Sequence, residues 1–187
     1  MVVAALDRAA AVRQALRALV AKHGFHGASM SAVAAEAGVA TGTAYTHYAS
    51  KDELVLATYL ETKGEWHEAA MAGVGPDMAP RDFFRQMWLA AYEHLAANRD
   101  HALFLLQVDC SPYKGPAHEA AMARDGDPLV EAVGAPPFAD HIQPLPLEVL
   151  YELGMAPAVR LAAGGEKLTP KQLRATADAC WRAVSRE

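Results

Sequence analysis

The chain has 187 residues, of which 52% are hydrophobic and 21% charged, with a formal net charge of −5 and a mean hydropathy of +0.02. This composition is typical of a globular protein and excludes a disordered or collagen-like chain. The two cysteines are too few and too far apart for a disulfide framework or a zinc site, and no apolar run approaches the roughly 20 residues of a membrane span.

The first residues, Met1 to Leu6, are apolar but no basic segment precedes them, and Asp7 follows, so we expect no signal peptide. We therefore expect a cytoplasmic protein with no membrane partner. The charge is uneven along the chain: residues 1–51 hold five Lys or Arg and two acids (+3), and the remainder holds 12 Lys or Arg and 20 acids (−8). A basic head on an acidic body favours contact of the head alone with phosphates.

Apolar residues spaced three and four apart, abundant alanine and scarce β-branched runs predict an all-α fold of about nine helices. Four prolines make the stretch 134–146 mostly non-helical, and Pro157 should kink the helix that contains it. We expect a three-helix helix-turn-helix head at 1–50 and a helical body at 51–187. The predicted helices are, in chain order, 5–23, 30–37, 41–48, 51–74, 80–97, 98–110, 116–125 with an extension to 133, 146–163 and 169–184.

Local patterns mark several helix ends. Gly24 can supply the left-handed conformation that ends the first helix, and Ser29 is a good N-cap for the second. Ser50 with Glu53 has the spacing of a capping box, and so has Thr169 with Gln172.

The segment Val33-Ala34-Ala35-Glu36-Ala37-Gly38-Val39 has the properties of a helix-turn-helix. Two helices that cross tightly need a small residue where their backbones approach, which Ala34 supplies, and the turn needs a positive φ, which Gly38 adopts without strain. The alternative is a pair of short core helices joined by a turn. The next helix favours the first interpretation, because Thr41 to Tyr48 is rich in hydroxyl groups and poor in large aliphatic residues.

At these residues the sequence resembles the N-terminal region of the TetR (tetracycline-repressor) family. The resemblance covers about residues 10 to 56, and spacing and residue type agree at some twenty positions. The rest of the chain matches the family only in its helical layout. The matching residues are Gly24-Phe25, Ser29-Met30, Val33-Ala34, Ala37-Gly38-Val39, Gly42-Thr43-Ala44-Tyr45-Thr46-His47-Tyr48 and Ser50-Lys51-Asp52-Glu53-Leu54.

The resemblance implies that one set of residues grips DNA phosphates: Ser29, Thr43, Tyr45, His47 and Lys51. Base-edge contact is expected from Thr41, Gly42 and Thr46. Tyr45 could instead pack its ring in the small core, and His47 and Thr43 could be ordinary surface residues.

The sequence departs from the family pattern at several positions in or beside the third helix. Tyr48 replaces the commoner Phe, and Thr41, Ala44 and Ala49 stand where bulkier or basic residues are frequent. No Lys or Arg lies in this helix, so we expect no strong bidentate guanine contact from it.

For the body, the resemblance implies a pocket for a small effector and a homodimer formed through the last two long helices. Our candidate effector-binding residues, for which ordinary core packing is the alternative, are Trp66, Met87, Trp88, Tyr92, Phe104, Met122 and Tyr151. We expect no metal and no cofactor, since His94 and His101 are seven residues apart with no carboxylate or cysteine at metal-ligand spacing in the sequence. For Cys110 a buried, inert thiol is favoured over a redox sensor.

The sequence thus favours a ligand-responsive regulator that binds double-stranded operator DNA as a homodimer, most simply a repressor released by a small molecule. A constitutive or architectural DNA-binding protein without an effector is the alternative. An enzyme is disfavoured, since no nucleophile–base motif, phosphate loop or close carboxylate pair is readable.

Overall fold

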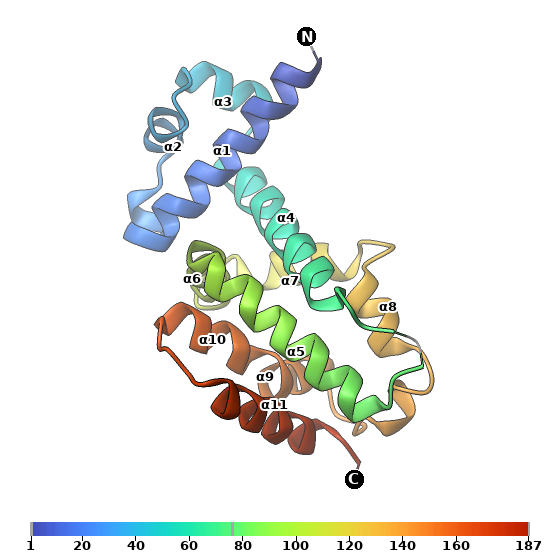
Figure 1. Ribbon diagram of the computed structural model, residues 1–187. Helices are drawn as coiled ribbons and strands as arrows, with labels where there is room; N and C mark the ends of the chain where they lie inside the picture. The colour runs from blue at the N-terminus through green and yellow to red at the C-terminus, as the bar shows by residue number, and fades with distance from the viewer. Residues whose placement is uncertain (1, 76, 187) are drawn as a thin grey trace. The chain divides into compact units, whose positions relative to one another are not determined.

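The computed structural model describes residues 2–75 and 77–186, with side chains from residue 8 onward. The described residues contain no β-strand and only one isolated bridge, between Ile142 and Ser185. None of the helices in these ranges is long and apolar enough to cross a membrane. The helices in Figure 1 are α1 (Val2–His23), α2 (Met30–Glu36), α3 (Thr41–His47), α4 (Lys51–Met71), α5 (Pro80–Ala97), α6 (Arg99–Asp109), α7 (Lys114–Met122), α8 (Pro128–Gly134), α9 (Leu147–Gly154), α10 (Ala156–Gly164) and α11 (Pro170–Val184), with short 3-10 turns at Phe25–Gly27 and Ala139–His141.

The all-α class is confirmed, but the described residues form eleven α-helices where about nine were predicted. Two predicted helices are each divided. Asp127 caps a new helix with Pro128 in its first turn, which separates α8 from α7. Pro157 lies in the first turn of α10, where its missing N–H costs nothing, so the expected kink is a break at Met155 between α9 and α10.

The chain forms two compact units. Unit 1 comprises the described residues up to Lys63 together with Leu103–Arg124, and unit 2 comprises Gly64–Ala102 together with the described residues from Asp125 onward. Helices α4 and α6 contribute residues to both units. The functional division at residue 50 that the sequence suggested remains a prediction.

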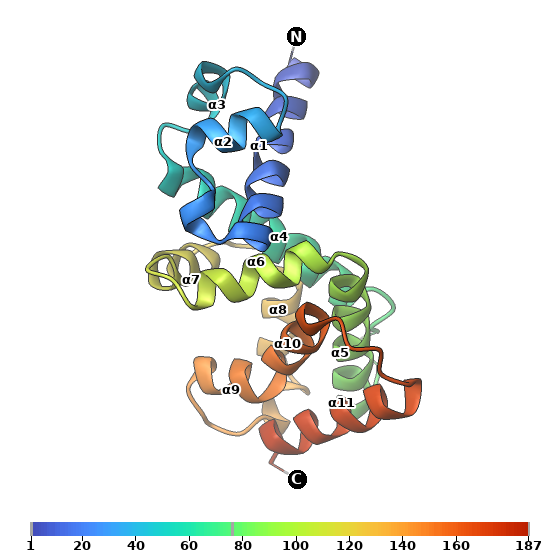
Figure 2. The same cartoon turned by 90° about the vertical axis from the view of Figure 1, so that its left-hand side faces the viewer.

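In unit 1, helices α2 and α3 pack on each other and on α1 (Figures 1 and 2). Their shared core consists of fully buried small and branched side chains, among them Leu16, Val33, Ala34 and Ala44. Small residues at these positions let short helices approach closely, so the head is stabilised by burial although α2 and α3 each have only two turns.

In unit 2, helix α5 packs against α10 and α11, and α9 packs against both of these helices. The apolar side of α5 contributes Phe84 and Trp88, which are almost completely buried. The indole N–H of Trp88 donates a hydrogen bond to the carbonyl of Gly154 at 3.1 Å, and the ring of Phe84 lies 5.6 Å from that of Trp181. These contacts join the start of the body to its last helices.

Helix α8 is fixed at its N-terminus by the carboxylate of Asp127. One oxygen accepts hydrogen bonds from the amides of Leu129 and Val130, both at 3.1 Å, and the other lies 2.7 Å from Nδ1 of His67 on α4. Burial alone would raise the pKa of Asp127, but the hydrogen bond and charge of His67, with the two amides, outweigh it and lower the pKa to about 2. The carboxylate is therefore ionised and holds α8 to α4 within unit 2.

We predict that Asp127→Ala lowers the free energy of unfolding by about 1–3 kcal/mol, because it removes a helix cap and leaves His67 without its carboxylate. The exposed neighbour Asp125 offers a matched control, and Asp125→Ala should change stability by less than about 0.5 kcal/mol. Urea unfolding followed by circular dichroism measures both. Equal effects of the two substitutions would contradict the role given to Asp127.

Candidate nucleic-acid interface

The turn between α2 and α3 has the geometry of a helix-turn-helix. Ser29 caps α2 by accepting a hydrogen bond from the amide of Ala32 at 3.2 Å. Gly38 has a φ of 66°, and the amide of Val39 donates to the carbonyl of Ala34 at 2.9 Å. A side chain at Gly38 would meet no atom, so glycine is needed here for the backbone conformation and not for space.

Helix α3 buries only Ala44 and presents the rest of its surface outward. Thr41, Gly42 and Thr46 are exposed, and the side chain of Tyr45 is 51% exposed. Thr43 and His47 are half-buried at its edge. The hydroxyl of Thr46 donates to the carbonyl of Gly42 at 2.9 Å, which leaves its oxygen free to accept. Because the side chain of Tyr45 is half exposed, its ring is not packed in the core of the head.

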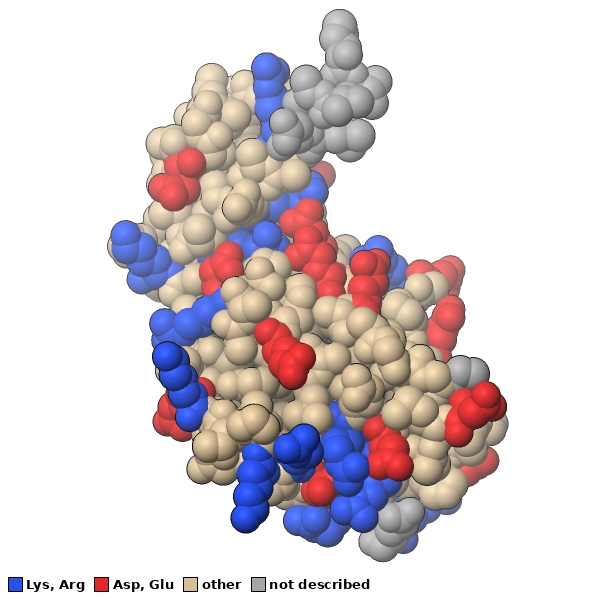
Figure 3. Space-filling model, viewed as in Figure 1, with Lys and Arg blue, Asp and Glu red and all other residues tan. Residues whose placement is uncertain are grey.

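Charged side chains are sparse over α2 and α3 (Figure 3). Glu36 is the only Asp, Glu, Lys or Arg in the two helices. The nearest candidate cation is Lys51 in the first turn of α4, where Nζ donates to the carbonyl of Phe25 at 2.5 Å and lies 5.9 Å from the ring centre. Partial burial lowers the pKa of Lys51 from its ordinary value. An ammonium group has three N–H donors, so this contact positions Lys51 and still leaves donors for a phosphate.

The N-terminus of α4 is capped as the sequence predicted, with one difference. The amide of Glu53 donates to Oγ of Ser50 at 3.1 Å, but the carboxylate of Glu53 accepts from the amide of Ala49 at 2.7 Å. The reciprocal contact thus lies one residue earlier than in a capping box.

Residues far along the chain complete the head. The ring of Tyr113, just before α7, lies 4.9 Å from that of Phe25, and its hydroxyl donates to Asp52 at 2.8 Å. Burial and the neighbouring carboxylate of Asp52 raise the pKa of Tyr113 to about 12. Phe104 of α6 also lies near Phe25, with ring centres 6.3 Å apart and the rings tilted by 59°. Unit 1 is therefore a helix-turn-helix supported by α6 and α7, and no local pattern in the sequence indicated these contacts.

The hydroxyl that distinguishes Tyr48 from the commoner Phe has a structural use. It accepts a hydrogen bond from Arg13 of α1 and donates to the carbonyl of Ala9 at 3.3 Å. Nε of the same arginine donates to Glu61 of α4 at 2.8 Å. The hydrogen bond to Glu61 contributes most to raising the pKa of Arg13, so the guanidinium stays charged and joins α1, α3 and α4.

The predicted effector residues divide between the two units. Phe104 and Met122 belong to unit 1, where Phe104 is fully buried and Met122 is 56% exposed. In unit 2, Trp88 stacks on Tyr92 with ring centres 6.0 Å apart, and Trp66 lies edge-on to Tyr151 at 6.5 Å. Met87 lies on the apolar side of α5 and is almost completely buried. Within the described ranges, no three His, Cys, Asp or Glu side chains are placed to hold a metal ion.

Two family profiles match the chain. The first, described as "Bacterial regulatory proteins, tetR family", matches residues 12–58. The second, described as "Tetracyclin repressor-like, C-terminal domain", matches residues 81–185, which is more than half of the chain. No curated protein matches the sequence.

Solved structures share the fold over nearly the whole chain. A TetR family transcription regulator from Marinobacter aquaeolei VT8 has a TM-score of 0.81 and 21% identity, with 100% of both chains covered. A TetR-family regulator from Haemophilus influenzae RD has a TM-score of 0.80 and 23% identity, covering 98% of this chain and 99% of that one. A TetR family protein from Vibrio parahaemolyticus has a TM-score of 0.73 and 27% identity, covering 96% and 100%.

We predict that Tyr48→Phe lowers the free energy of unfolding by about 1–2 kcal/mol, since it deletes two hydrogen bonds and keeps the ring. Tyr45→Phe is the matched control, because the exposed hydroxyl of Tyr45 lies outside this network, and it should cost less than about 0.5 kcal/mol. Chemical denaturation of both variants checks this. If Tyr48→Phe were as stable as the control, Tyr48 would not join the three helices.

Proposed function

We propose, from the premise that this chain belongs to the TetR family of bacterial transcription regulators, that it is a repressor which a small molecule releases from its operator. The observation that carries the DNA-binding part is the exposed, hydroxyl-rich surface of α3 on a packed helix-turn-helix head. We propose no enzymatic activity and, because the proposed target is DNA, a cytoplasmic location.

In this proposal, α3 enters the major groove and its edge residues contact the backbone. Thr41, Gly42 and Thr46 would lie against base edges, since they are exposed on a helix with little else to bury. Ser29, Thr43, Tyr45, His47 and Lys51 would contact phosphates. Because α3 has no Lys or Arg, most of the affinity would come from phosphate contacts and from two heads binding together.

We predict that the double variant Tyr45→Ala, Lys51→Ala binds DNA more weakly at every sequence. It should also reduce the slope of log affinity against log salt concentration by about 1, because one cation no longer displaces a counterion. Fluorescence anisotropy with a random duplex and with the DNA upstream of the protein's own gene measures both effects.

Lys167→Ala is the control for this experiment, because Lys167 is an exposed lysine outside the head and should leave affinity and slope unchanged. Circular dichroism confirms that each variant is folded. Unchanged DNA affinity in a folded double variant would contradict the proposal that the head binds DNA.

We further propose that two copies associate through the last two long helices that the sequence predicted, 146–163 and 169–184, with α9 providing the apolar contact. Leu147, Val149 and Leu153 of α9 are exposed large hydrophobic residues, and Val149 and Leu153, four residues apart, lie on one side of the helix. The outer side of α11 differs, since Lys171, Arg174 and Arg182 are exposed on it. Lys and Arg side chains gather in Figure 3 where Figure 1 places α11, so this helix would flank the contact.

The effector would act by changing the population of dimers whose heads fit two successive major grooves. Half-sites lie about 34 Å apart or at a multiple of this distance, so a ligand that favours another spacing lowers operator affinity. The ligand shifts this population only if it binds dimers of one head spacing more tightly than dimers of the other.

We predict that Leu153→Lys converts a dimer into a monomer at micromolar concentration, because a charge would be buried without a partner. Met122→Lys is the control, since Met122 is also an exposed apolar side chain but lies on α7. Sedimentation velocity distinguishes the species. Should Leu153→Lys remain a dimer, the contact does not involve this side of α9.

A further inference from the structure

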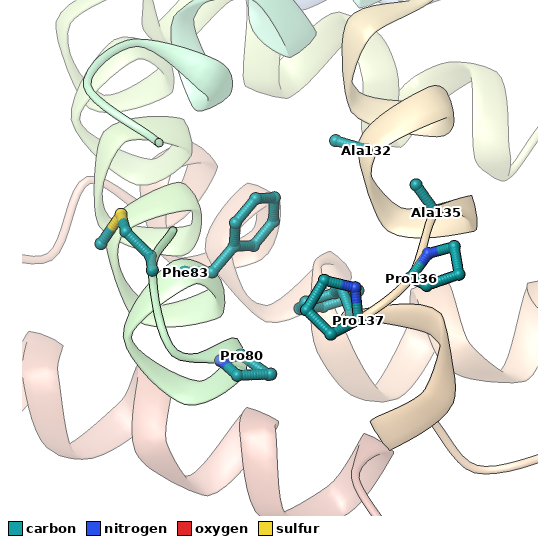
Figure 4. Close-up of a pocket in the computed structure, with 8 residues that line it drawn as sticks. Pro80, Phe83, Ala132, Ala135, Pro136 and Pro137 are labelled. Carbon is teal, nitrogen blue, oxygen red and sulfur yellow. The ribbon is translucent and has the colours of Figure 1, made fainter. Parts of the chain in front are cut away.

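Unit 2 contains an open pocket of about 160 Å³ between the start of α5 and the end of α8. Figure 4 shows its walls, with the ring of Phe83 facing the short side chains of α8 and the segment that follows. Ala135, Pro136 and Pro137 are exposed, so the pocket opens to solvent on their side. The residues labelled there are Pro80, Phe83, Ala132, Ala135, Pro136 and Pro137.

Every lining side chain is apolar and none can form an ion pair with a ligand; the one weak acceptor among them, the sulfur of Met78, already accepts a hydrogen bond from the amide of Gly75. A charged group inside would lose part of its hydration without a charged protein partner, which disfavours its binding. The pocket therefore selects against anions and cations, and a polar substituent would have to point out of the opening.

The pocket is backed by a rigid aromatic cluster. The rings of Phe83 and Phe138 lie 4.9 Å apart, and Phe138 lies 5.8 Å from Trp181, which is almost fully buried. The opposite wall consists of alanine and proline, whose side chains are too short or too stiff to fill the space. The space thus persists because its large side chains are held by one another and its small ones cannot reach it.

We propose that this pocket binds an uncharged apolar molecule the size of one aromatic ring or a chain of about six carbons. The size follows from the volume, since an apolar cavity of about 150 Å³ accommodates benzene. The aromatic wall offers edge and face contacts to a ring. That the bound molecule is the effector rests on the proposed function; the binding itself does not.

The pocket has a route to α4. Ala132 and Ala135 belong to the C-terminal end of α8 and the residue after it, and the N-terminus of the same helix is bound through Asp127 to His67 of α4. A ligand held between α5 and α8 would favour one position of α8, and the carboxylate–imidazole contact would pass that preference to α4.

The test uses the full chain without DNA and follows fluorobenzene by ¹⁹F NMR. We expect saturable binding by the wild-type protein and none of 4-fluorobenzoate. Ala132→Leu, which fills the pocket, should weaken fluorobenzene binding at least about tenfold, a loss of 1.4 kcal/mol. Val130→Leu is the matched control, because Val130 is exposed on the same helix outside the lining and should bind as wild type does.

Ala135→Leu provides a second filling variant at an exposed position, where the core is not disturbed if Ala132→Leu does not fold. Absence of saturable binding to the wild type, or equal binding by a folded filling variant and the control, would overturn the site. Equal binding of 4-fluorobenzoate would overturn the ligand class. Because DNA is absent, failure of the proposed DNA-binding role would leave these results unchanged.

Discussion

Helix α4 makes a charged contact in each of the two units, and each contact fixes a neighbouring helix. In unit 1, Glu61 at the middle of α4 holds Arg13 of α1, and in unit 2 His67 holds Asp127 at the beginning of α8. The backbone between these points is an unbroken helix with no proline. Loss of either contact would release an element of its own unit: α1 from α4 in unit 1, and the capped start of α8 from α4 in unit 2.

Short-range interactions made the ends of several helices and the turn of the head predictable. Gly24 and Gly38 both adopt the positive φ expected of them, and Ser29 and Thr169 both cap their helices. These interactions span at most four residues, so local spacing patterns in the sequence predict them. The contacts that hold the head to its supports span much greater distances. Tyr113 reaches Asp52 across 61 residues and Arg13 reaches Glu61 across 48, and no spacing rule identifies such pairs.

The divided helices and the pocket were missed for different physical reasons. Asp127 followed by Pro128 is a helix-start pattern that was present in the sequence, but apolar residues on both sides suggested one continuous helix. The pocket left no such pattern. Large aromatic residues mark the parts of the interior that are already filled, and Trp66 and Trp88 are both almost completely buried. A cavity lies where side chains are short, and Ala132 and Ala135 resemble other alanines of the chain until the opposite wall is known.

The absence of Lys and Arg from α3 has a consequence for how such a regulator would search a chromosome. Non-specific affinity for DNA depends on the number of phosphates that a protein neutralises, and each additional cation lengthens its stay on random sequence. A recognition helix without cations would release wrong sites quickly, so fewer molecules would be sequestered along the genome. Occupancy of the operator would then depend on the ratio of specific to random binding, and not on the affinity for the operator alone.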